Sequence, residues 1–456
     1  VGPFQSQNMS LNSYSTSRGE EMGRAQVVQA LAAGTEPVVE MNPVLLKPEG
    51  NSRSRVILMG RPWRSLSAGD YHGGRYVLWS SVEMSFEKLS AVNDLIFVEG
   101  AGSPAESNLK ESEIVNMKVA RTFGCPVLLV GDIDRGGVFA AIAGTLALLT
   151  EEERALVKGF LINKFRGDLR LLEPGLHMLS DLTEGRPTLG VIPWLDNLAV
   201  AREDSADLGD DGPPAKGEID IAVIKLPGIL NFDDFDPLAL EEGVSVRFTD
   251  DPGRLGRPDA VILPDSRNPE ESLAWMRARG FDSLIGALVL SGSSAAGIAG
   301  GYRMLGRSLT TPVGKEVAGL GLLPVASRLS ADSALTPASG VTVPSEGFPG
   351  PGALPVEGLA EEGAASELLE GGAPLATLSG GGTDGAVSAG GRVWGTALHG
   401  VFDHPALRAE WLRFLGLKGK GESLPLKEVR ERAFHRLADE VEAALDMKEL
   451  ERIIGL

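Results

Sequence analysis

The chain has 456 residues, of which 43% are hydrophobic and 23% are charged. This balance excludes a chain that is disordered throughout, and no stretch approaches about 18 uninterrupted apolar residues, which excludes a membrane-spanning helix. The net charge of −19 disfavours binding to nucleic acid without sequence preference, because such proteins need a basic surface. We therefore expect a globular protein of two or three domains, with no nucleic-acid or membrane partner.

The first half of the chain alternates apolar runs with amphipathic stretches. Strands are predicted at Leu95–Val98, Val127–Val130 and Phe160–Ile162, and helices at Glu111–Phe123 and Ala140–Lys158. This alternation predicts an α/β fold in which helices cover both faces of a parallel sheet.

The only cysteine, Cys125, lies just before the second of these strands. One cysteine excludes an internal disulfide and a zinc site built from cysteines. The N-terminus has no basic segment followed by an apolar run, so we expect no secretory leader and a cytoplasmic location. We expect Cys125 to be a small core residue.

Polar residues follow each of the three predicted strands, where open α/β sheets bind their ligands. Glu99 is a candidate Mg²⁺ ligand, followed by glycines that let backbone amides approach phosphate, although a plain turn is the alternative. Asn163 and Lys164 follow the third strand, where a side-chain amide can read a nucleobase edge. The second strand is followed by Asp132, Asp134, Arg135, Gly136 and Gly137. This set favours a ligand site, and a solvated loop in which Arg135 pairs with a carboxylate is the alternative.

Two segments near the N-terminus are rich in amides and hydroxyls and lack the apolar stripe of a helix. Their polar residues are Gln7, Asn8, Ser10, Asn12, Glu21, Arg24 and Gln26. Residues 41–48 and 51–55 continue this polarity. Such segments suit a substrate surface, with an exposed loop as the alternative.

Residues 203–217 are acidic and rich in glycine and proline, as is typical of a linker. We predict domains at 1–205 and 218–456, joined by a linker at 206–217. The second domain repeats the α/β pattern, and residues 330–390 give no clear pattern. Its predicted elements are strands at Ile219–Leu226, Ala260–Leu263 and Val393–Thr396, a helix at Glu270–Leu284 and a helical end at Leu426–Ile454.

The phosphate-binding pattern G-x-x-x-x-G-K-[ST] does not occur in the sequence. The nearest string begins at Gly416 and has Glu422 at the position of the essential lysine. It follows no predicted strand, so we expect it to be a solvated loop.

Long strings along the chain together resemble the cobyric acid synthases, the glutamine-dependent amidases of cobalamin synthesis. In chain order they are QNMSLNS (7–13), GRAQVVQA (23–30), MNPVLLKPEGNSRS (41–54), VEGAGSPAE (98–106), GDIDRGGVFA (131–140), INKFRGD (162–168), IAVIKLP (221–227), NFDDFDP (231–237), LPDSRN (263–268), GIAGGYRMLG (297–306) and GTALHGVF (395–402). The resemblance covers nearly the whole chain and is weakest at 325–375.

The resemblance implies two α/β domains: a P-loop domain like dethiobiotin synthetase and MinD-type ATPases, and a class I glutamine amidotransferase-like domain of flavodoxin-like architecture. It implies ATP-dependent amidation of peripheral carboxylates of adenosylcobyrinic acid a,c-diamide. ATP phosphorylates a carboxylate, Mg²⁺ offsets the phosphate charge, and ammonia displaces the phosphate. The ammonia comes from glutamine, which is cleaved by a cysteine nucleophile with a histidine base.

Several positions of this sequence match site residues of the family. Glu99 stands at a Mg²⁺ ligand, with Glu21 as a second candidate. Asn163 and Lys164 correspond to positions near the adenine, and residues 132–137 correspond to the nucleotide and substrate cleft. The polar residues of the N-terminal segments suit the corrinoid surface. His399 matches the amidotransferase base.

The chain also departs from the family pattern. Ala299 occupies the position of the nucleophile, and a methyl group cannot attack an amide. Asp265 replaces a glycine in the segment that supplies donors for the oxyanion, where a carboxylate opposes negative charge. Gln5 replaces a lysine, and the stretch at 358–362 lacks the family's G-Y-E-I-H pattern. The family's ATP-binding loop would precede Val1, so we expect a truncated chain that lacks it.

These departures predict a loss of glutaminase activity, with His399 as a remnant. The first functional alternative is a ligase of this family, represented here by a truncated chain, whose full-length form uses free ammonia or an external glutaminase. The second is a homologue that binds a corrinoid or a partner without turnover. The third is a MinD/ParA-like regulatory ATPase, which the missing phosphate-binding loop and the strings at 7–13 and 41–54 disfavour.

Overall fold

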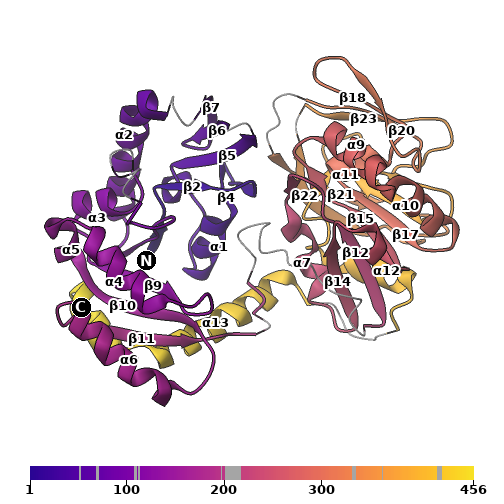
Figure 1. Ribbon diagram of the computed structural model, residues 1–456. Coiled ribbons are helices and arrows are strands. Elements are labelled where there is room, and N and C mark those ends of the chain that lie inside the picture. Colours follow the sequence, from indigo (N-terminus) through magenta and orange to yellow (C-terminus); the bar gives the residue numbers. More distant parts are fainter. Residues whose placement is uncertain are drawn as a thin grey trace. The chain divides into compact units, whose positions relative to one another are not determined.

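The computed structural model describes residues 1–50, 53–67, 71–106, 110, 113–196, 198–200, 217–330, 335–361, 363–418 and 424–456. The chain forms two compact units (Figure 1). Unit 1 comprises Val1–Met9, Gln26–Val200 and Arg430–Leu456, and unit 2 comprises Ser10–Ala25 and Ala201–Val429. The linker expected at 206–217 lies outside the described residues, except for Gly217.

Parallel strands form the centre of unit 1. Strand β1 (Gly2–Phe4) pairs with β8 (Ile96–Val98), and a second sheet has the order β11 (Thr188–Pro193), β10 (Val157–Phe165), β9 (Val127–Asp132). The three strands predicted for this half are therefore confirmed. Apolar residues of β10 pack against helices α3 (Met117–Phe123), α4 (Val138–Leu148) and α6 (Leu169–Leu182), and the half-buried Cys125 lies against the same core.

The helices of unit 1 differ from the prediction at their ends. The stretch predicted as one helix at Ala140–Lys158 is α4 followed by α5 (Glu151–Leu156) and the start of β10. Thr150 separates the two helices, because its side chain and that of Glu153 each accept a hydrogen bond from the other's backbone N–H. Helix α3 begins only at Met117, after a turn in which the Glu113 carboxylate accepts backbone N–H groups.

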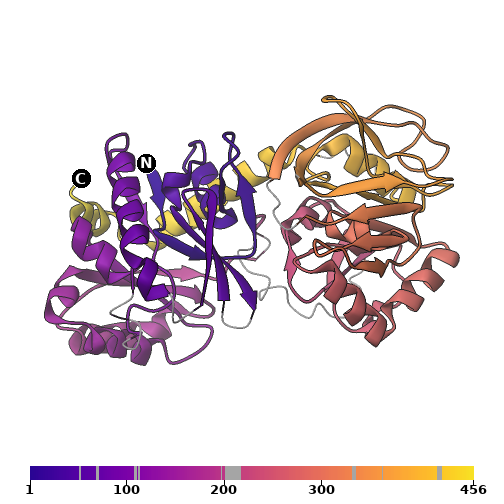
Figure 2. The same ribbon diagram turned by 90° about the horizontal axis from the view of Figure 1, so that it is seen from above.

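A third sheet of unit 1 was not predicted from the sequence. Its order is β2 (Gln7–Met9), β5 (Val44–Gly50), β6 (Arg53–Leu58), β7 (Arg61–Ser67). Helix α2 (Tyr71–Ser90) contacts β5 and the short helix η1 (Val39–Met41), and Figure 2 shows α2 beside these indigo strands. Helix α1 (Arg24–Ala32) follows β2 in the sequence, after the hairpin of β3 (Ser13–Ser15) and β4 (Glu21–Gly23), which belongs to unit 2.

Unit 2 contains a six-stranded sheet that is parallel except for β26. Its order is β14 (Val244–Thr249), β12 (Ile219–Ile224), β15 (Ala260–Leu263), β17 (Ser294–Ile298), β27 (Val393–Thr396), β26 (Ala386–Val387). Alternate residues of β12 face opposite sides. Ile221 and Val223 pack with α12 (Pro405–Leu415), and Ala222 and Ile224 pack with α9 (Pro269–Arg279), α10 (Phe281–Leu290) and α11 (Gly300–Leu305). Helices on both faces confirm the predicted α/β class.

Glycine divides the helix predicted at Glu270–Leu284. The structure has α9 (Pro269–Arg279) and α10 (Phe281–Leu290), separated by Gly280 with φ +80. This left-handed conformation ends α9, and it favours glycine because a Cβ would be strained there. The predicted helical end is likewise two helices, α13 (Leu426–Ala444) and α14 (Met447–Ile454), and Asp446 caps the second.

The stretch at 330–390, which gave no pattern, supplies antiparallel strands to unit 2, drawn in orange in Figure 2. One sheet has the order β25 (Thr383–Asp384), β24 (Ala376–Leu378), β21 (Leu335–Thr342), β22 (Pro355–Glu361), β28 (Leu398–His399). A second sheet has the order β19 (Glu316–Ala318), β18 (Ser308–Thr310), β20 (Val325–Arg328), β23 (Ala365–Leu368). Strand β22 brings Leu359 opposite His399 and so fixes the position of that histidine.

Shorter elements complete unit 2. They are the hairpin β3 (Ser13–Ser15) and β4 (Glu21–Gly23), the pair β13 (Ile229–Leu230) and β16 (Asp265–Ser266), and the helices η3 (Phe232–Phe235), α7 (Asp236–Ala239), α8 (Pro252–Leu255) and α11 (Gly300–Leu305). Across the parts of the chain that the structure describes, no helix combines the length and apolarity needed to span a membrane.

Candidate functional site

A tight turn in unit 2 places Ala299 between β17 and α11. Ala299 is fully buried and has φ 48 and ψ −110, a backbone conformation that is rare for a residue other than glycine. Glycines make the turn possible: a Cβ at Gly301 would lie 1.8 Å from the Leu263 carbonyl oxygen. A strained strand–turn–helix of this kind is used to present a nucleophile, but here it presents a methyl group.

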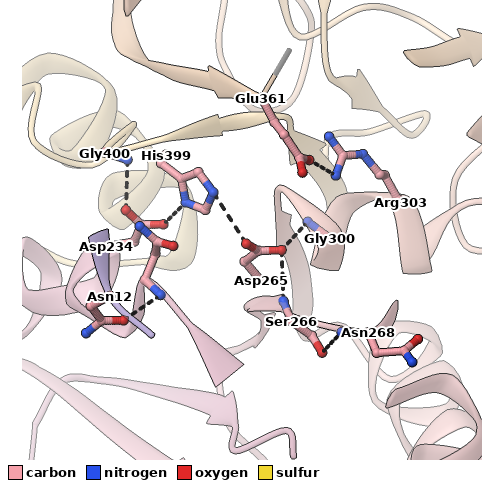
Figure 3. Close-up of polar contacts among 11 residues, drawn as sticks. Asn12, Asp234, Asp265, Ser266, Asn268, Gly300, Arg303, Glu361, His399 and Gly400 are labelled. Carbon is pink, nitrogen blue, oxygen red and sulfur yellow. Dashed lines mark hydrogen bonds and ion pairs between the residues drawn. The ribbon is translucent and has the colours of Figure 1, made fainter. Parts of the chain in front are cut away.

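His399 lies between two carboxylates (Figure 3). Its Nδ1 is 2.7 Å from Asp234 Oδ2, and its Nε2 is 3.5 Å from Asp265 Oδ2. The other oxygen of Asp234 accepts the backbone N–H of Gly400 at 2.9 Å. Both nitrogens of the imidazole are therefore directed at acidic groups.

The two carboxylates control the charge of His399. Burial lowers the pKa of His399, but Asp234 and Asp265 raise it, and the result is about 10. Burial raises the pKa of Asp234 above its ordinary value and outweighs the opposing effect of His399. Burial also acts to raise the pKa of Asp265, but His399 and Arg303 hold that pKa below its ordinary value. A protonated imidazole at neutral pH cannot accept a proton from a nucleophile.

Asp265 also uses the backbone donors at the turn. Its Oδ1 accepts the N–H of Gly300 at 2.9 Å and the N–H of Ser266 at 2.8 Å. Backbone N–H groups beside a nucleophile normally stabilise the oxyanion of acyl transfer. In this protein they bind a side-chain carboxylate.

A cavity of about 420 Å³ in unit 2 borders His399 and is lined from the N-terminal segments by the predicted residue Arg24 and by Ser13 and Tyr14. Arg24 lines it and pairs with Asp233 at 2.8 Å. Asn12 lies close by, since its side-chain oxygen accepts the backbone N–H of Asn231 at 3.0 Å, and Ser10 accepts the N–H of Asn12. The structure thus brings Ser10, Asn12 and Arg24 into the histidine-containing unit.

The remaining polar residues of the N-terminal segments do not line this cavity. Glu21 lies half-buried on β4 of unit 2, and Gln7 lies half-buried on β2 of unit 1. Gln26 forms a buried chain in unit 1: its Oε1 accepts from Asn8 at 3.0 Å, and its Nε2 donates to Gln5 at 2.5 Å. Gln5 in turn donates to a backbone carbonyl at residue 100, so this chain supports the loop after β8.

Glu99 follows β8 and lines a cavity of about 780 Å³ in unit 1. Its carboxylate accepts a hydrogen bond from Gln29 at 2.6 Å. Gly100 and Gly102 line the same cavity. Within the described ranges, no group of three or more His, Cys, Asp or Glu residues is placed to hold a metal ion.

Strands β9 and β10 are paired in unit 1, so the predicted residues at their ends are neighbours. Asp132 pairs with Lys164 at 2.9 Å and contacts Arg135 at 3.8 Å, and the hydrogen bond from Lys164 lowers the pKa of Asp132. The backbone N–H of Asp134 donates to Asp132, and the Asn163 side chain accepts the N–H of Lys164. Gly136 and Gly137, both with positive φ, then lead into α4. The pairing of Arg135 with a carboxylate, expected for a solvated loop, is present within this cluster.

Asp234 is the site residue that the sequence reasoning missed. It lies in the string NFDDFDP, which was used only for its resemblance. Two adjacent acids between Phe232 and Phe235 are unusual in a buried segment, and charged residues are rarely buried without a partner. That pattern was the available signal, although the partner, His399, lies 165 residues away.

Comparisons with known proteins agree with this geometry. The CobB/CobQ-like glutamine amidotransferase domain family matches residues 220–407, and an AAA domain family matches residues 17–202. A solved glutamine amidotransferase matches 43% of this chain and 99% of its own, at 18% identity and a TM-score of 0.33. Fold and site thus define a protein with a nucleotide-binding-type α/β unit and a glutamine amidotransferase-type unit.

Full-length similarity gives the particular family. The cobyric acid synthase of Moorella thermoacetica is 46% identical over 100% of this chain and 92% of its own length. Those of Sorangium cellulosum and Desulforudis audaxviator are 47% and 45% identical, each over 100% of this chain and 93% of their own lengths. The chain belongs to the cobyric acid synthase family.

Proposed function

We propose that this protein amidates peripheral carboxylates of adenosylcobyrinic acid a,c-diamide at the expense of ATP, and that its ammonia does not come from its own glutamine hydrolysis. The amide-forming chemistry is assigned to unit 1 and the inactive glutaminase to unit 2. Because the reaction consumes ATP, we place it in the cytoplasm. The observation that carries the second part is the methyl group of Ala299 at the strained turn after β17.

In the proposed reaction, one carboxylate, one ATP and one ammonia are converted to an amide, ADP and phosphate. A carboxylate oxygen attacks the γ-phosphorus of ATP, and the bond to the bridging oxygen of ADP breaks. The nitrogen of ammonia then bonds to the acyl carbon, phosphate leaves, and the nitrogen loses a proton. ATP and the corrinoid are both anionic, so the reaction needs cations at the phosphates.

Residues of unit 1 supply groups suited to this task. Lys164 and Arg135 are cations at adjacent strand ends, and Asn163 offers a side-chain amide for the base. Glu99 is the proposed Mg²⁺ ligand, since Mg²⁺ in nucleotide sites is held by one or two carboxylates together with phosphate oxygens. When bound, the ion would offset the phosphate charge.

Three features of unit 2 support the loss of glutaminase activity. Residue 299 has no atom that can form an acyl intermediate. His399, with its pKa raised to about 10 by Asp234 and Asp265 against the lowering effect of burial, is already protonated at neutral pH. The N–H of Gly300 donates to Asp265 Oδ1, so this donor is already satisfied within the protein.

The test supplies the full-length protein with the corrinoid, ATP and Mg²⁺, and changes only the nitrogen source. One arm contains ¹⁵N-ammonium with unlabelled glutamine, one glutamine alone, and one glutamine with a separate added glutaminase. Mass spectrometry of the corrinoid reports both amide formation and the isotope incorporated. Reactions without ATP serve as controls.

We expect ¹⁵N in the product of the first arm, no product with glutamine alone, and product again when the separate glutaminase is added. Amide formed from glutamine alone, with glutamate released, would refute the assignment of Ala299. No product from any nitrogen source would refute the ligase activity itself.

A further inference from the structure

We propose that the Asp265 carboxylate occupies the anion-binding site beside residue 299. This side chain of the protein itself thereby excludes the oxyanion that would form during acyl transfer. The inference rests on the proposed loss of glutaminase activity and predicts that a single reversion at position 299 does not restore it. The site consists of two backbone N–H groups, those of Gly300 and Ser266, and the imidazolium of His399 (Figure 3).

Both oxygens of the Asp265 carboxylate are engaged. Oδ1 accepts the two backbone N–H groups at 2.9 and 2.8 Å, and Oδ2 lies 3.5 Å from His399 Nε2. The side chain retains only 13% of its exposed surface. A carboxylate so placed satisfies the donors that an oxyanion would otherwise use.

The backbone holds the carboxylate in this position. Asp265 and Ser266 form β16, which pairs with β13 so that Leu230 lies opposite Asp265. The Ser266 hydroxyl lies 2.6 Å from that of Ser272 on α9. The fit against the turn is close, since a Cβ at Gly300 would lie 2.5 Å from Asp265 Oδ1.

The charges around His399 favour the position of the Asp265 carboxylate. The His399 cation lies between two buried carboxylates, with Asp234 at Nδ1 and Asp265 at Nε2. Removing a single partner of a buried ion pair leaves an uncompensated charge, so displacement of Asp265 by a neutral glutamine amide is unfavourable. An incoming substrate therefore meets a site that is already occupied.

The direct test removes the occupant and supplies a substitute. In Asp265→Gly, the vacated donors should bind formate, which carries the same carboxylate group without a side chain. We expect saturating sodium formate to raise the Tm of this variant by about 2 °C or more relative to equal sodium chloride. The unmodified protein and Asp265→Asn, whose side-chain oxygen still fills the site, should show no such rise.

A second test measures the effect on chemistry. Glutamate release from glutamine is compared in Ala299→Cys, Ala299→Cys with Asp265→Asn, and Ala299→Cys with Asp265→Gly. Because an oxyanion donor contributes about 100-fold or more to turnover, the glycine double variant should exceed the single variant by about 100-fold. The asparagine double variant should stay near the single variant.

Either result can overturn the inference. It fails if formate does not stabilise Asp265→Gly selectively, or if the glycine double variant exceeds Ala299→Cys by less than about tenfold, including the case in which neither has activity. These outcomes are distinct from failure of the proposed function, which is decided by the unmodified chain with glutamine alone.

Discussion

Replacing Asp234 by asparagine should lower the pKa of His399, which is protonated at neutral pH in the unmodified protein. Asparagine has the same size, and its side-chain oxygen can still accept the Gly400 N–H that Asp234 accepts at 2.9 Å. The substitution removes the negative charge that lies 2.7 Å from His399 Nδ1. The imidazole then keeps only Asp265, at 3.5 Å, as an anionic neighbour.

The size of the effect follows from the distances. A pKa of His399 raised from 6.5 to about 10 corresponds to about 5 kcal/mol of net preference for the charged ring, at about 1.4 kcal/mol per pH unit. Coulomb attraction falls with distance, so the nearer Asp234 supplies more than half of it. Asp234→Asn should therefore lower the pKa of His399 to about 8 or below.

The stability of the protein should follow the same titration. The folded-state pKa of His399 lies above the ordinary value of 6.5, so its stabilisation is fully present below pH 6.5 and is lost as the pH rises toward about 10. Over that range this group alone should reduce the free energy of unfolding by up to about 1.4 kcal/mol per pH unit. In Asp234→Asn the decline should end at a lower pH.

The assay is NMR of protein labelled at histidine. The chain has five histidines, and His399→Gln identifies the resonance by its disappearance. A His399 resonance that titrates near 6.5 in the unmodified protein, or that still titrates near 10 in Asp234→Asn, would refute the reasoning.

Three further outcomes follow from ion pairs and carboxylates elsewhere in the two units. Arg24→Met leaves the buried Asp233 without its cation, so we expect a loss of about 3 kcal/mol in urea unfolding, and a loss below about 1 kcal/mol would contradict the burial argument. Lys164→Met removes a partly exposed cation, so the free energy of unfolding should change by less than about 1 kcal/mol. The KM for ATP should rise about tenfold relative to the control Lys158→Met, which removes an exposed lysine of the same strand. An unchanged KM would exclude Lys164 from the nucleotide site. Glu99→Gln should raise the Mg²⁺ concentration needed for half-maximal amide formation without changing the Tm, and an unchanged Mg²⁺ dependence would exclude Glu99 as a ligand.

Short buried strands were predictable because their signal is local. Ala260–Leu263 and Val393–Thr396 match the structure end for end, since each is an apolar run bounded by turn-forming residues. Helix ends were less predictable, because they depend on capping. Gly280 and Thr150 each divide a continuous apolar pattern, the first by a left-handed backbone and the second by a side-chain cap.

The site was only partly predictable, because its members are distant in the sequence. Ala299 and His399 were identified through the resemblance, and the strand-end cluster around Asp132 through the position of ligand sites in parallel sheets. Asp234 was not, since nothing local pairs it with a histidine 165 residues later. The placement of Ser10–Ala25 in unit 2 likewise depends on contacts made far along the chain.

That N-terminal segment limits how the protein can be divided into fragments. A fragment expressed from residue 218 onward would lack Ser10–Ala25 while retaining Arg430–Leu456, which belongs to unit 1. It would leave Asp233 without Arg24, and the backbone N–H of Asn231 without the Asn12 oxygen. Gene fission at the acidic segment would thus yield two incomplete polypeptides, because each would carry a segment that belongs to the other unit.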